Sequence, residues 1–108
     1  EFLHADDLAD ACVFLMQNCS ASELDGHVNI GTGVDVSIRE LTHLIQKTVD
    51  YKGALAFDAS KPDGTPRKLL NVEKMNKLGW TAKKTLEKGL EDTYDWYLAN
   101  LNLSKDAS

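Results

Sequence analysis

Residues 27–49 read HVNIGTGVDVSIRELTHLIQKTV, and this stretch sets the expected fold. Its first residues alternate like a short strand, and the GTG of residues 31–33 ends that strand in a tight turn. The next helix begins with a capping box, in which Ser37 caps the helix and Glu40, three residues later, reaches back. Apolar residues recur at helical spacing over residues 38–50. A strand, a tight turn and a helix together favour an α/β unit.

Similar patterns flank this unit on both sides. The carboxylates Asp6 and Asp7 occupy the expected start of the first helix, where the helix dipole favours negative charge. We therefore expect a small α/β arrangement, an α+β-like fragment with about three short strands and four helices, thin enough to be part of a larger sheet. The other expected elements are an extended segment at residues 1–4, a helix to about Asn18, a polar loop at residues 18–26, a strand at residues 54–57, a short helix capped by Asn71 and stopped by Gly79, and a last helix that opens at Thr85.

The composition indicates one soluble domain of ordinary type. The chain has 108 residues, of which 43% are hydrophobic and 27% are charged. We expect the domain to occupy residues 1–103 and a frayed tail to occupy residues 104–108. No apolar run approaches the ~20 residues that span a bilayer, and no signal peptide is visible. Cys12 and Cys19 lack metal-ligand spacing, which favours reduced cytoplasmic thiols.

Charge is distributed unevenly along the chain. The net charge of −5 argues against a nucleic-acid surface, which needs a broad basic face. Residues 57–68, FDASKPDGTPRK, nevertheless hold both prolines, and Lys61, Arg67 and Lys68 outnumber the anion Asp63 between positions 61 and 68. The prolines stiffen the loop, so its cations lose less entropy on binding a small anion. Arg67 offers a planar fork for phosphate, Lys68 a mobile charge, and Asp63 an acceptor for sugar hydroxyls or ring N–H groups. A solvated turn with incidental charge explains the loop about equally well.

No residue pattern supplies catalytic chemistry. The turn at residues 31–33 lacks the third glycine of a dinucleotide-binding fingerprint, so a simple turn is the stronger interpretation. Tyr-x-x-x-Lys, Gly-x-Ser-x-Gly and His-Glu-x-x-His patterns are absent from the sequence, and its three histidines are scattered. We therefore predict no catalytic, cofactor-binding or metal-binding residue in this chain.

Four stretches resemble one known family in the same order and with similar spacing. EFLHADDLADA, HVNIGTGVDVSIREL, FDASKPDGTPRKLL and LGW resemble motifs in the C-terminal part of GDP-L-fucose synthase, an extended short-chain dehydrogenase/reductase. SKPDGTPRK is the string specific to that family, whereas the first and third motifs alone would indicate the wider sugar-nucleotide epimerase group.

The resemblance implies a substrate-binding fragment whose Asp63 contacts the substrate and whose Lys68 lies near the diphosphate-linked sugar, with Arg67 adjacent. It implies a parent enzyme that is cytoplasmic and homodimeric and that uses NADPH on a GDP-linked keto-deoxy sugar. The N-terminal Rossmann domain and the catalytic groups would lie outside this chain, which alone would be inactive. A free-standing sugar-nucleotide binding or interaction module, or part of another NAD-dependent sugar-nucleotide epimerase or dehydratase, are the alternatives.

Overall fold

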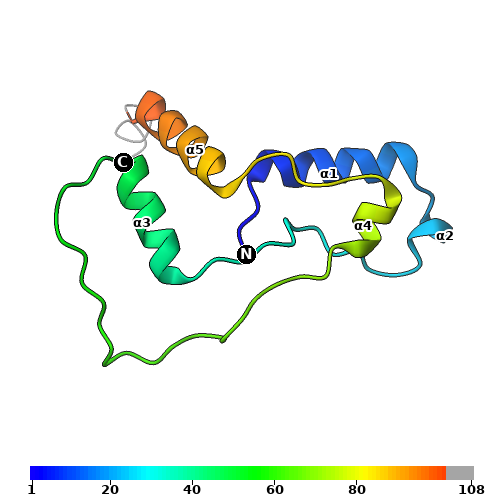
Figure 1. Ribbon diagram of the computed structural model, residues 1–108. Coiled ribbons are helices and arrows are strands. Elements are labelled where there is room, and N and C mark those ends of the chain that lie inside the picture. The colour runs from blue at the N-terminus through cyan, green and yellow to red at the C-terminus, as the bar shows by residue number, and fades with distance from the viewer. Residues whose placement is uncertain (102–108) are drawn as a thin grey trace, which may run out of the picture.

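The computed structural model describes residues 1–101, and Figure 1 shows two groups of helices joined by long connections. One group contains α1, α2 and α4, and the other contains α3 and α5. The segment between α3 and α4 runs as a wide loop that contains no helix. The helices are α1 (Ala5–Asn18), α2 (Ala21–Leu24), α3 (Ile38–Thr48), α4 (Glu73–Leu78) and α5 (Leu86–Asn100).

The predicted α/β class is wrong, because residues 1–101 contain helices and no strand. The segments expected as strands, residues 1–4, 27–30 and 54–57, have no strand assignment. A strand requires a neighbouring strand that accepts and donates backbone hydrogen bonds. Outside the helices, the hydrogen bonds between backbone amides and carbonyls of residues 1–101 join close neighbours, such as Trp80 N to Met75 O, and the long-range hydrogen bond within the main chain is a single one from the amino group of Glu1 to Lys68 O at 3.2 Å. The alternating residues favour an extended backbone, but no second strand pairs with them within residues 1–101.

The helix predictions are largely confirmed, because helix ends depend on local residues. Ser37 Oγ accepts a hydrogen bond from Glu40 N at 3.2 Å, and Glu40 Oε2 accepts one from Ser37 N at 2.9 Å, so the capping box forms. Thr85 caps α5 by accepting from Lys88 N. Three details differ. The N-cap of α4 is Val72 and not Asn71, whose Oδ1 accepts from Glu73 N at 2.9 Å. The loop expected at residues 18–26 contains the single turn of α2, and the tail expected at residues 104–108 lies outside the described residues.

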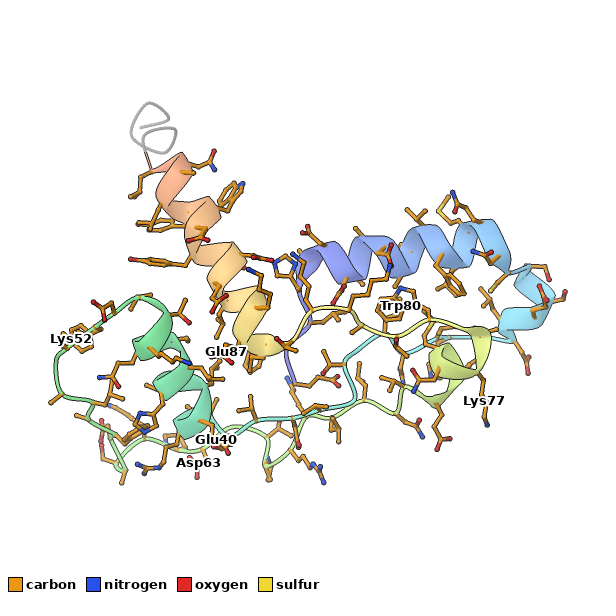
Figure 2. The ribbon with its side chains drawn as sticks, turned by 45° about the horizontal axis from the view of Figure 1, so that its top comes forward. Glu40, Lys52, Asp63, Lys77, Trp80 and Glu87 are labelled. Atoms are coloured by element: carbon orange, nitrogen blue, oxygen red, sulfur yellow. The ribbon has the colours of Figure 1, made fainter. Side chains whose placement is uncertain are left out.

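The small core lies between α1, α4 and the turn after α4. Its buried apolar residues are Ala11, Met75 and Trp80. Trp80 Nε1 donates a hydrogen bond to Asp10 Oδ2 at 2.8 Å, and Figure 2 shows Trp80 beneath α1. Because the indole packs in the core and its N–H is paired, Trp80 joins the turn after α4 to α1.

A buried carboxylate makes a second connection between the same elements. Asp7 is 3% exposed, and its Oδ2 accepts backbone hydrogen bonds from Lys83 N at 3.1 Å and Lys84 N at 2.9 Å. Asp7 therefore satisfies two backbone donors of the connection to α5, besides lying in the first turn of α1. Asp7 and Asp10 of the first motif thus hold residues 80–84 against the start of α1.

The surface of the chain is larger than that of a compact monomer. Its accessible area is 8380 Å², whereas about 5,900 Å² is typical for 11.9 kDa. The radius of gyration is 17.5 Å, compared with about 13 Å for a compact domain of 100 residues. Met16 on α1 and Trp96 on α5 are 85% and 67% exposed. The described elements therefore expose apolar surface of the kind that further protein normally covers.

Charged side chains support α5 at its amino-terminal half. Asp92 accepts hydrogen bonds from Lys84 Nζ at 2.6 Å and pairs with Lys88 Nζ at 2.9 Å. Across the helix pair, Lys47 Nζ of α3 lies 2.6 Å from Glu87 Oε1 of α5. These ion pairs orient α5 relative to α3 and to the segment before it.

The Asp92 cluster predicts acid sensitivity. Hydrogen bonds from Lys84, and next from Lys88, lower the pKa of Asp92 from 3.8 to about 2. A lowered carboxyl pKa adds stability above the unfolded value, and this is lost as the pH falls from about 4 toward 2. We expect the thermal midpoint of the wild type to exceed that of Asp92→Asn at pH 5, with the difference shrinking toward pH 2. A difference that stays constant over this range would contradict the assignment.

Candidate functional site

A cleft of about 740 Å³ lies between the 57–68 loop and the amino end of α3. One wall is formed by residues 63–68, and the other by residues 35–38 with Glu40. In Figure 2, Asp63 of the loop lies near Glu40 of the first turn of α3. The cleft is thus built from segments that are separated in sequence.

The cleft brings together the three residues that the sequence analysis selected. Asp63, Arg67 and Lys68 all line it, whereas Lys61, at the other end of the loop, is not among the described residues that do. The side-chain cations of the cleft are Arg67 and Lys68, and its carboxylates are Asp63, Asp35, Glu40 and Glu1. Ser37 binds Glu40 and Gly33 N binds Glu1, so Arg67, Lys68 and Asp63 are the loop groups that could meet a small anion with hydroxyl or N–H groups.

Arg67 is fixed by an ion pair that the sequence did not reveal. Its Nε donates to Asp35 Oδ2 at 2.5 Å, and its Nη2 donates to Asp35 Oδ1 at 3.3 Å. This hydrogen bonding lowers the pKa of the Asp35 carboxyl and raises the pKa of the Arg67 guanidinium, so both stay charged. Sequence reasoning missed Asp35, because no local pattern links it to a partner 32 positions away.

The helix-capping residues shape the opposite wall. Ser37 Oγ lies 2.7 Å from Glu40 Oε2, and hydrogen bonds from Ser37 lower the pKa of Glu40. The Glu40 carboxylate is therefore occupied by the helix cap. Asp63 is the carboxylate that the loop offers to a ligand in the cleft. The amino end of α3 adds a favourable dipole for negative charge beside the cations.

The glycine turn at residues 31–33 does not suit a dinucleotide phosphate. Gly33 N donates to Glu1 Oε2 at 2.7 Å, and a Cβ added at Gly31 would lie 2.5 Å from Glu1 Oε1. A carboxylate already occupies the turn, and a phosphate there would meet like charge. The residues of this chain therefore do not fit the phosphates of NADP at this turn.

Other candidate groups have structural contacts. His4 Nδ1 accepts a hydrogen bond from Asp6 N at 3.1 Å and so caps α1. Among residues 1–101, no group of three histidine, cysteine, aspartate or glutamate residues is placed to hold a metal ion. In the same part of the chain, no helix has the length and hydrophobicity needed to cross a bilayer.

The chain is similar in sequence to GDP-L-fucose synthases, although no protein-family model matches it. It is 56% identical over 101 residues to putative GDP-L-fucose synthase 2 of Arabidopsis thaliana, covering 94% of this chain and 30% of the relative. It is 51% identical over 106 residues to GDP-L-fucose synthase of Escherichia coli, covering 93% and 33%. The chain thus spans about a third of the length of these curated relatives.

Solved structures give the same result for the backbone. A GDP-6-OMe-4-keto-L-xylo-heptose reductase from Campylobacter jejuni matches with a TM-score of 0.87 and 38% identity, covering 93% of this chain and 31% of that one. The GDP-mannoheptose C4 reductase MlghC of the same organism, with NADP bound, matches with a TM-score of 0.81 and 39% identity over 91% of this chain and 31% of that one. Sequence and backbone together show that this chain matches about a third of the length of the GDP-L-fucose synthases, and that its structural neighbours are sugar-nucleotide reductases of the extended short-chain dehydrogenase/reductase type.

Proposed function

We propose that the protein containing this segment converts GDP-4-keto-6-deoxy-D-mannose to GDP-L-fucose by epimerisation and NADPH-dependent reduction. The observation that carries this proposal is the identity of 56% to a putative GDP-L-fucose synthase across 94% of the chain. The cleft agrees with it, because Asp63, Arg67 and Lys68 gather there from the loop whose sequence resembles that family's.

In this proposal the segment binds the substrate and forms or breaks no bond. Arg67 and Lys68 provide charged donors for the diphosphate, and Asp63 accepts from a sugar hydroxyl or a base N–H. Holding the nucleotide sugar in one orientation accelerates the reaction at its sugar, because the substrate loses rotational freedom on binding, before the chemical step. The groups that move protons and the cofactor that supplies hydride belong to the rest of the protein.

The remaining part of the protein supplies the cofactor site and covers the exposed surface. We place NADPH on an N-terminal Rossmann domain, since a related reductase is solved with NADP bound and the turn at residues 31–33 holds a carboxylate. The excess area of roughly 2,500 Å², relative to a compact monomer, is enough for a domain interface. This excess also argues against a free-standing module. We further propose that the whole protein is a homodimer in the cytoplasm.

A second candidate differs only in the sugar. The relatives include a GDP-L-colitose synthase of Yersinia pseudotuberculosis at 35% identity, and the solved neighbours include heptose reductases. Their names agree on GDP and differ in the attached sugar. A reductase for another GDP-linked keto sugar is therefore the runner-up.

The test uses the full-length protein with NADPH and GDP-4-keto-6-deoxy-D-mannose. We expect NADPH to be consumed and the product to be GDP-L-fucose by NMR. Consumption only with a GDP-linked keto-heptose would favour the second candidate. A protein that binds GDP-sugar but oxidises no NADPH with either substrate would support a binding module instead.

A further inference from the structure

We infer that Asp35 is a positioning residue that holds Arg67 in the orientation needed to bind the diphosphate of a GDP-sugar. The inference rests on the proposed function and goes beyond it by assigning a role to a residue outside the binding loop. It is carried by the two-point contact between the Asp35 carboxylate and the Arg67 guanidinium, in a cleft that both residues line.

The geometry leaves donors available on Arg67. Asp35 engages Nε and Nη2, and a guanidinium carries five N–H donors in a rigid plane. Among the described residues, Asp35 uses two of these donors, so three N–H groups of Arg67 remain for a ligand. Two hydrogen bonds from one edge of the guanidinium to the same carboxylate fix the orientation of the whole plane, and so the direction in which its other N–H groups point. A single hydrogen bond would leave the plane free to rotate.

Side-chain contacts join the loop to α3 and to the segment just before it. At one end, Arg39 Cζ lies 4.2 Å from the centre of the Phe57 ring, and at the other end Arg67 pairs with Asp35. Within residues 58–66 the side-chain hydrogen bonds are local and join Ser60 to Asp58. The position of this stretch, which includes Asp63, therefore depends on contacts at its two ends: Phe57 with Arg39 at one, and Arg67 with Asp35 at the other, where Glu1 N also donates to Lys68 O at 3.2 Å.

Charge and positioning predict opposite effects when Asp35 is neutralised. Asp35 is an anion beside a site proposed for an anionic ligand, so Coulomb's law alone predicts that removing its charge strengthens binding. Loss of positioning predicts weaker binding, because Arg67 must then be ordered when the ligand binds. The sign of the change therefore distinguishes the two roles.

The experiment is calorimetric titration of the full-length protein with GDP. We expect Asp35→Asn to weaken GDP binding about tenfold, and Arg67→Lys, which keeps the charge and loses the fork, to weaken it similarly. The double variant should be no weaker than Arg67→Lys, because Asp35 acts through Arg67. The unliganded thermal midpoint of Asp35→Asn should match the wild type, since an exposed ion pair adds little stability.

The matched control is Asp50→Asn, the same substitution at an exposed residue outside the cleft. Asp50 has a φ of 54°, a backbone conformation that asparagine tolerates, so GDP binding should be unchanged. Equal or tighter binding by Asp35→Asn, or additive losses in the double variant, would overturn the inference while leaving the proposed function intact. A wild type that binds no GDP would overturn both.

Discussion

Replacing Asp7 with alanine is expected to lower the free energy of unfolding by about 2–4 kcal/mol. Asp7 is 3% exposed, and its Oδ2 accepts from both Lys83 N and Lys84 N. Alanine would leave two partly buried backbone donors without an acceptor and would open a space beside the core. The contact between α1 and the segment that leads into α5 should loosen, because these hydrogen bonds join them.

The measurement is urea unfolding of the full-length protein, with Asp6→Ala as the matched control. Asp6 is the neighbouring carboxylate in the same helical turn, and its side chain is 73% exposed. We expect Asp6→Ala to cost less than about 1 kcal/mol, because a helix-end charge and a surface ion pair contribute little. Equal costs for the two variants would show that Asp7 acts only as a helix-end charge.

This pair of aspartates shows where sequence reasoning stops. Both carboxylates were correctly placed at the start of α1, since helix signals act over three or four residues. The burial of Asp7 depends on a turn about 76 positions away, which periodicity does not reveal. The expected strands failed for a related reason: alternation favours an extended chain, but a sheet needs a second strand, and none pairs within residues 1–101.

The candidate site could be predicted to the extent that it is local. Prolines, a turn and cations lie together in residues 57–68, so a stiff anion-binding loop was visible. The opposing wall was not, because Asp35 and the amino end of α3 meet the loop only in the folded chain. Residues that contact a ligand directly, such as Arg67 and Lys68, can be recognised from their side-chain chemistry in the sequence. Residues that orient them, such as Asp35, are recognised only from contacts in the folded structure.

Lys68→Ala is expected to weaken GDP-sugar binding by the full-length protein about 10- to 100-fold. This corresponds to the roughly 1.5–3 kcal/mol of a hydrogen bond to a charged group. Lys68 lines the cleft next to Arg67, and a desolvated ammonium close to a phosphate contributes far more than one separated from it by water. The measurement is the dissociation constant from calorimetric titration at about 0.15 M salt, where distant charges are screened.

The control is Lys61→Ala, which removes the same charge from the same loop. Lys61 is absent from the described lining of the cleft, so it acts on the ligand only through longer-range attraction. We expect a loss below about threefold, and we expect salt to abolish that loss while the effect of Lys68→Ala persists. Equal losses that vanish together in salt would mean that the loop attracts the nucleotide by its overall charge, and Lys68 would then have no contact of its own. Because the two variants carry the same net charge, any lasting difference between them reports position within the cleft.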